Sequence, residues 1–115
     1  MKRVRAVRRS RRHENVDVFT ALADPTRRQI LDALSHGEQS VSAIVPAFRM
    51  TRSAVSQHLG VLREAGLVRE RRVGRERRYR IDGRPLQHVY RWLSHYERFW
   101  DRALDRLDES LDRMS

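Results

Sequence analysis

The segment from Thr51 to Val68 constrains the fold more than any other, because it joins an apolar stripe to a short-chained polar face. On a helical period of 3.6 residues, the stripe consists of Ala54, Val55, Leu59, Val61, Leu62 and Ala65. The opposite side carries Ser53, Ser56, Gln57 and Gly60, flanked by Arg52 and Arg63. Surface helices usually carry long charged side chains. Short polar side chains, by contrast, let the helix backbone come close to another molecule and still offer hydrogen-bond donors and acceptors. The segment therefore predicts a helix that enters the major groove of DNA.

The positive charge of the chain is concentrated in two places. The 115 residues have a formal net charge of +10. Residues 1–15 hold seven basic side chains and one acidic, and residues 67–84 hold eight basic and three acidic, so these blocks carry +6 and +5. Residues 16–66 and 85–115 carry 0 and −1. Localised charge of this kind indicates contact with the phosphates of a nucleic acid.

Several classes of protein are excluded by what the sequence lacks. It contains no cysteine, which excludes disulfides, thiolate metal sites and thiol redox sensing. No apolar run approaches the ~18–20 residues that span a bilayer, and no apolar region of a secretory signal follows the basic start. We expect a cytoplasmic protein without a membrane partner. Ser56 and His58 point in different directions on a helix, and no glycine-rich phosphate loop or nucleophile elbow appears, so no enzyme, catalytic residue or cofactor is expected.

Capping residues predict where the neighbouring helices begin. Asp24 is a good N-cap and Pro25 suits the first turn of the helix that follows. The apolar face of that helix consists of Ile30, Leu31 and Leu34. Ser40 caps a short helix over residues 41–48, which Pro46 should truncate or distort.

Two further segments precede these helices. Residues 1–13 combine like charges with no sustained apolar period, which predicts a disordered arm. The arm is either a solvated tail or a segment that lies along phosphates or in a minor groove. A short helix is expected over residues 16–23, and its inward side chains are Val16, Phe19, Leu22 and Ala23.

A basic β-hairpin follows the polar-faced helix. Its expected strands are Leu67–Val73 and Arg77–Ile81, and a two-residue Gly74-Arg75 loop would place Val68 opposite Ile81 and Glu70 opposite Tyr79. The arginines expected to cluster at the tip are Arg71, Arg72, Arg75, Arg77 and Arg78. Because like charges then oppose each other across the strands, the cluster destabilises the folded hairpin unless phosphates neutralise it.

The C-terminal segment predicts one long helix over residues 86–111. Apolar side chains recur there at spacings of three or four, namely Leu86, Val89, Leu93, Tyr96, Trp100, Leu104, Leu107 and Leu111. Tyrosine and tryptophan are enriched at interfaces, and so small a chain has little core left to cover this seam. We therefore expect the seam to form the interface of a homodimer, the alternative being a helix that folds back on its own domain.

These elements together form a winged helix-turn-helix, mostly α with a β-hairpin wing, and the chain resembles the ArsR-type (arsenic-repressor-like) family of bacterial transcriptional repressors. The resemblance rests on segments 19–31, 54–59, 62–68 and 74–80. It implies a homodimer that binds an imperfect palindrome in a promoter and blocks transcription. The expected organisation is a basic arm over residues 1–15, a winged helix-turn-helix core over 16–84 and a dimerisation helix over 85–115.

The sequence departs from the metal-sensing members of that family. Their thiolate motif would fall around residues 41–48, where this chain has no cysteine. On the terminal helix His88 and His95 are seven residues apart, with Asp82 and Glu97 nearby, so the spacing of a chelating pair is missing. The ending at residues 96–102 looks like that of members without a known metal site. We therefore expect no metal ligand and a repressor without a metal effector.

The expected DNA contacts divide by role. Gln57 can pair with adenine N6 and N7, while Ser53 and Ser56 can contact bases or phosphates. Thr51 suits a phosphate, and Arg52 suits either a guanine or a phosphate. The five hairpin arginines should follow phosphates or enter a minor groove.

His58 falls toward the apolar side of the polar-faced helix, which favours a packing or hinge role over contact with phosphate. The alternatives to an operator-binding repressor are a metal- or ligand-responsive sensor that uses His88 and His95, and a sequence-neutral architectural protein that binds double-stranded DNA through its arm and wing.

Overall fold

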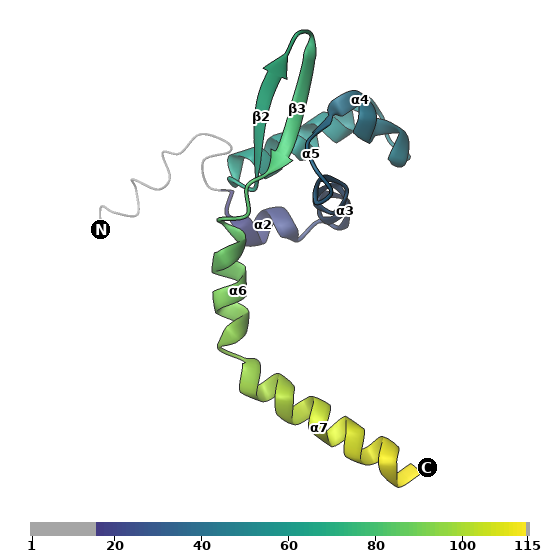
Figure 1. Cartoon of the computed structure of the whole chain (residues 1–115), viewed down its shortest axis with the longest axis vertical. Coiled ribbons are helices and arrows are strands. Elements are labelled where there is room, and N and C mark those ends of the chain that lie inside the picture. The colour runs from purple at the N-terminus through teal and green to yellow at the C-terminus, as the bar shows by residue number, and fades with distance from the viewer. Residues whose placement is uncertain (1–15, 115) are drawn as a thin grey trace, which may run out of the picture.

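The computed structural model describes residues 16–114, so the predicted disordered arm lies outside the described residues (Figure 1). In chain order the elements are α2 (Val18–Leu22), α3 (Pro25–Leu34), β1 (Gln39–Ser40), α4 (Val41–Ile44), η1 (Val45–Ala47), α5 (Arg52–Glu64), β2 (Val68–Val73), β3 (Glu76–Ile81), α6 (Leu86–Ser94) and α7 (Glu97–Met114). Elements α2 to β3 form a head, from which α6 and α7 project (Figure 1).

The core of the head lies where α3, α4 and α5 meet the base of the β2–β3 hairpin. Ile30 of α3 and Leu59 of α5 are wholly buried there, and Tyr79 of β3 is only 2% exposed. Because α5 supplies its apolar stripe to this core, its other side is left outward. The predicted apolar face of α3 is confirmed, since all three of its residues are buried.

The predicted helix starts at Asp24, Ser40 and Thr51 are confirmed. In each case the side-chain oxygen accepts a hydrogen bond from the backbone N–H three residues on, at 3.0, 3.1 and 3.0 Å respectively. Pro46 also acts as expected, because α4 ends at Ile44 and continues only as the 3₁₀ turn η1.

The predicted inward face of the first helix is right for Val16 and Leu22 and wrong for Phe19 and Ala23. Helix α2 begins after its N-cap Asp17 and buries Val18 and Ala21. Phe19 is instead 43% exposed, and its ring lies edge-on against Trp92 of α6 with centroids 5.5 Å apart. Ala23 is exposed in the turn to α3, while Val16 and Leu22 are partly buried against the core. A helix that packs against α6 as well as α3 uses a different face from the one that its own period indicates.

The hairpin has the predicted register. Val68 pairs with Ile81 and Glu70 with Tyr79, and the loop is the two-residue Gly74-Arg75. Gly74 has φ +63°, a conformation that glycine adopts without strain. The two-residue strand β1, which the sequence does not predict, adds to the free edge of β3, so that the sheet order in the described chain is β1-β3-β2.

The prediction of one long C-terminal helix is wrong. Helix α6 ends at Ser94 and α7 begins at Glu97, and the two helices meet at an angle (Figure 1). The Ser94 hydroxyl donates to the carbonyl of Tyr90 at 2.8 Å, and His95 Nδ1 donates to the carbonyl of Arg91 at 2.9 Å. These side chains occupy carbonyls that a continuing helix would use, which bends or ends helices.

Candidate nucleic-acid interface

Helix α5 presents its polar face to solvent because its opposite face is anchored in the core. The anchoring residues are Val55, Leu59 and Leu62, all wholly buried. Ser53 and Gln57 are exposed, whereas Ser56 and Gly60 are partly buried. The structure thus brings the predicted reading residues onto one side of one rigid helix.

The end of α5 fixes the wing beside this face. Gly66 adopts φ +79°, and its N–H donates to the carbonyl of Arg63 while the N–H of Leu67 donates to the carbonyl of Leu62, both at 2.9 Å. This pair of hydrogen bonds is a Schellman motif, which reverses the chain sharply. Leu67 is wholly buried, and β2 starts one residue later. The wing therefore starts from a rigid junction rather than from a loop.

One face of the wing is joined to α5 through Glu70. This carboxylate forms ion pairs with Arg63 of α5 and with Arg77 of β3, the latter at 3.6 Å between Oε2 and Nη1. Arg77 also donates through Nη2 to the hydroxyl of Ser56 at 3.4 Å. Ser56 thus lies where α5 meets the wing, beside Arg77.

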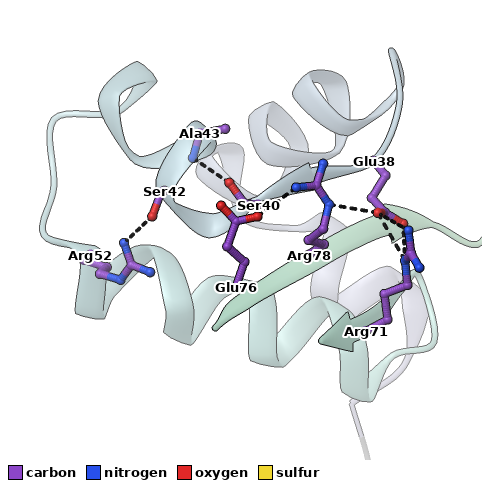
Figure 2. Close-up of polar contacts among 8 residues, drawn as sticks. All are labelled: Glu38, Ser40, Ser42, Ala43, Arg52, Arg71, Glu76 and Arg78. Atoms are coloured by element: carbon purple, nitrogen blue, oxygen red, sulfur yellow. Dashed lines mark hydrogen bonds and ion pairs between the residues drawn. The ribbon is translucent and has the colours of Figure 1, made fainter. Parts of the chain in front are cut away.

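The other face of the wing is held by Glu38, which lies just before β1 (Figure 2). The Arg71 guanidinium donates to both carboxylate oxygens of Glu38, with Nε–Oε1 and Nη2–Oε2 distances of 3.0 Å. Arg78 donates through Nε to Oε2 at 2.9 Å and through Nη1 to Glu76 at 2.9 Å. These hydrogen bonds, from Arg71 and then Arg78, hold the pKa of Glu38 below its usual range. We call Glu38, Arg71 and Arg78 the wing clamp.

The wing arginines therefore do not form one cluster, contrary to the prediction. Arg71 stands opposite Arg78 and Arg72 opposite Arg77, but carboxylates of the chain itself offset three of these four charges. Within residues 16–114, Arg72 and Arg75 are exposed and have no carboxylate partner. Glu38 was missed because it lies 33 residues before Arg71, and no local pattern connects the two.

The base of the wing is neutralised in a similar way by Asp82. Arg84 and Arg69 both hydrogen-bond its carboxylate, with Nη2–Oδ2 and Nε–Oδ2 distances of 2.7 and 3.0 Å. The bonds from Arg84, more than that from Arg69, hold the pKa of Asp82 far below its usual range. These two arginines therefore serve the junction between β3 and α6.

The residues at the start of α5 have partners within the protein. The hydroxyl oxygen of Thr51 is the N-cap acceptor, and Arg52 donates through Nη1 to the hydroxyl of Ser42 at 3.0 Å (Figure 2). Both residues are exposed at the same end of the helix. They lie together at the edge of the polar face of α5.

His58 is partly buried against the start of α3, where its contacts are polar rather than part of the apolar core. Its side chain is 23% exposed, and Nδ1 lies 3.9 Å from Asp24 Oδ2 and 3.4 Å from Arg27 Nη1. Arg27 also donates to the carbonyls of Ala21 and Thr20, at 2.8 and 3.1 Å. His58 thus joins α5 to the turn between α2 and α3.

A long apolar seam runs along the projecting helices. Large side chains between 40% and 57% exposed follow one another at helical spacing, namely Leu93, Tyr96, Trp100, Leu104 and Leu107. Leu86 and Val89, also predicted for the interface, instead pack against the core of the head. The accessible part of the seam therefore begins at Leu93.

Neither a metal centre nor a membrane span is found in the described part of the chain. Over residues 16–114, no three His, Cys, Asp or Glu side chains lie close enough together to hold a metal ion. No helix in the same range is both long enough and apolar enough to cross a bilayer. The imidazole of His95 bonds the Arg91 carbonyl, and His88 is exposed on α6.

Gly60→Ala is expected to stabilise the fold by about 1 kcal/mol, because glycine inside a helix is less favourable than alanine by that amount. A Cβ at Gly60 would meet no heavy atom within 4 Å, so the methyl group costs nothing in the isolated protein. Thermal unfolding should show a midpoint raised by several degrees. An unchanged or lowered midpoint would contradict the open space at this position.

Comparisons with known proteins agree on one family. The sequence pattern described as "Bacterial regulatory protein, arsR family" matches residues 24–70, which run from α3 into the wing. The transcriptional repressor SdpR of Bacillus subtilis is 32% identical over 80 residues, covering 70% of this chain and 89% of that protein. The HTH-type transcriptional regulator Rv2034 of Mycobacterium tuberculosis is 41% identical over 94 residues, covering 82% and 85%.

A solved structure shows the same architecture. It is the solution structure of a homodimeric winged helix-turn-helix DNA-binding domain from Mycobacterium bovis, described as a possible ArsR-family regulator. It is 38% identical to this chain with a TM-score of 0.58, covering 70% of this chain and 74% of that one. The winged helix-turn-helix prediction is thereby confirmed.

Proposed function

Because this chain belongs to the ArsR family of bacterial regulatory proteins, we propose that it is a homodimeric transcriptional repressor that reads a palindromic operator through α5. Members of the family are DNA-binding transcriptional regulators rather than enzymes. The operator, the dimer and the roles of single residues belong to the proposal.

The observation that carries the proposal is the position of Gln57. It is exposed in the middle of α5, between the exposed Ser53 and the wing, while the opposite face of the helix is wholly buried. Glutamine offers a donor and an acceptor that match adenine in the major groove. We assign base contacts to Ser53 and Gln57, and to Ser56 beside Arg77. We place Thr51 and Arg52 in contact with DNA at the edge of this base-reading surface.

The wing and the N-terminal end of α5 supply contacts to phosphate. Arg72 and Arg75 are exposed, and no carboxylate in residues 16–114 pairs with them, so they are available to the DNA backbone. Arg77 stands between Ser56 and Glu70 and joins the wing to α5. Such contacts set the position of the helix in the groove, and base contacts set the specificity.

A second copy of the chain covers the seam on α6 and α7. Interfaces are enriched in aromatic residues, and the seam exposes Tyr96 and Trp100 by about half of their surface, 45% and 52%. A two-fold dimer presents two α5 helices to half-sites about one helical turn apart. We assign residues 85–115 to dimerisation, with Leu86 and Val89 as the part that fastens the segment to the head.

We propose that no metal effector controls this dimer. The chain has no cysteine, so it lacks the thiolate motif of the sensors in its family. Of the two terminal histidines, His95 already bonds the Arg91 carbonyl, and His88 is exposed seven residues earlier on α6.

Gln57→Ala tests the reading of DNA sequence. An operator is first selected from a random DNA pool with the wild-type protein, and affinity is then measured on that operator and on random duplex. We expect the variant to lose ~1–3 kcal/mol for each lost base contact on the operator and almost nothing on random DNA. The ratio of the two affinities therefore falls by tenfold or more.

The control is Gln87→Ala, the same substitution at an exposed position of α6. It should leave both affinities unchanged. An equal loss on the two DNAs with Gln57→Ala, or no loss, would support a sequence-neutral architectural protein instead of an operator-binding repressor.

A further inference from the structure

The wing clamp joins three parts of the chain through one carboxylate. Glu38 lies between α3 and β1, and it binds one arginine from each strand of the hairpin (Figure 2). Its side chain is only 20% exposed, whereas Arg71 remains 63% exposed while paired. The carboxylate is thus enclosed by its partners, and the arginine heads stay near the surface.

The clamp divides four of the wing's arginines into two sets. Arg71 and Arg78 lie on the face of the hairpin that Glu38 covers. Arg71 pairs with this carboxylate, and Arg78 pairs with it and with Glu76. Arg72 and Arg75 have no such partner in the described chain. If all four guanidinium groups were available, the wing would attract any DNA phosphate, whatever the sequence.

We propose that Glu38 limits the sequence-neutral part of DNA binding, because it withholds Arg71 and Arg78 from DNA phosphates. This inference rests on the proposed function, because it concerns how the proposed DNA-binding protein holds the DNA backbone. Sequence-neutral affinity comes from phosphate contacts, whereas base contacts discriminate. A residue that removes phosphate contacts therefore weakens binding to the operator and to random DNA by the same factor.

The size of the effect follows from counterion release. Each additional phosphate contact steepens the dependence of log affinity on log salt concentration by about 0.9, which near 0.15 M salt is about fivefold in affinity. Because Arg78 keeps its ion pair with Glu76, we count one released arginine, Arg71, in each protomer, which gives a dimer two contacts. Random duplex should then bind more than tenfold more tightly.

Glu38→Gln is the direct test, because it removes the charge and keeps the shape. We expect binding to random duplex and to the operator to become stronger by the same factor, with a salt slope steeper by about 2 on both DNAs. The charge-matched control is Glu109→Gln on α7, which is exposed and has no ion pair in the described chain. It raises the net charge equally but should leave the slope unchanged. Circular dichroism and the thermal midpoint establish that both variants are folded.

Arg71→Ala with Arg78→Ala gives a second, independent result. Because the clamp already withholds these arginines, this variant should keep the wild-type salt slope. Adding Glu38→Gln to it should no longer steepen the slope. If Glu38→Gln alone fails to fold, the comparison of these two variants still tests the proposal.

Three results would overturn the proposal. They are an unchanged slope in Glu38→Gln, weaker binding of that variant to both DNAs, and a lowered slope in Arg71→Ala with Arg78→Ala. The second would mean that Glu38 serves only to hold the wing in position. The third would mean that the two arginines already contact phosphate. Failure of the proposed function would appear separately, as equal affinity ratios in Gln57→Ala and Gln87→Ala.

Discussion

Leu104→Glu combined with Leu107→Glu should convert the protein to a monomer and lower its affinity for the operator by about 10²- to 10⁴-fold, the range over which two linked binding modules exceed one. Both leucines lie in the middle of the α7 part of the seam and are 57% and 53% exposed. In a dimer the two glutamates would be buried against apolar side chains, and unpaired buried charge is strongly unfavourable.

The mass of the variant is measured by sedimentation at micromolar concentration, and its affinity is measured on the selected operator. The head should remain folded, because no residue of α7 belongs to the described core cluster. The matched control is Arg102→Glu, an exposed position of the same helix outside the predicted seam, and it should remain dimeric. A dimeric mass for the double variant would refute the assignment of the seam.

Local features of the fold were predictable because their causes lie within a few residues. Asp24, Ser40 and Thr51 each satisfy a backbone donor three residues on, so the cap can be read from the sequence around it. The register of the hairpin follows from its two-residue loop, since the loop length fixes which residues are opposite. The polar face of α5 follows from the helical period alone.

Features that depend on distant packing were not predictable in this way. Phe19 was expected inside the core, but it faces Trp92, which lies on a helix that the sequence had assigned to a dimer seam. The break after Ser94 depends on two side chains that take carbonyls from the last turn of α6, whereas the apolar period runs through it unchanged. A period describes which residues share a face, not whether the helix axis is straight.

The candidate site shows the same division. The candidate reading residues of α5 could be predicted from one helix, but the wing arginines could not be sorted into those with and those without a carboxylate partner. That sorting depends on Glu38, which reaches the hairpin only through the pairing of β1 with β3. Charge counts predict the amount of positive charge in the wing, and the fold decides how much of it is left without a carboxylate partner.

Arg72→Ala combined with Arg75→Ala should weaken binding to every DNA sequence. No carboxylate of the described chain is bound to either of these two exposed wing arginines, so their charge is available to phosphates. A dimer would lose four contacts, and at about 0.9 for each contact the salt slope should become shallower by about 3.6. Near 0.15 M salt this corresponds to a loss of about a thousandfold in affinity.

The loss must be equal on the operator and on random duplex, because phosphate contacts carry no sequence information. Affinity is measured on both DNAs over a range of salt concentrations. Arg98→Ala with Arg102→Ala removes the same charge from α7 and should change the slope little, since only charge near the phosphates releases counterions. A loss confined to the operator would instead place these arginines among the residues that read sequence or groove width, and an unchanged slope would remove the wing from the DNA interface.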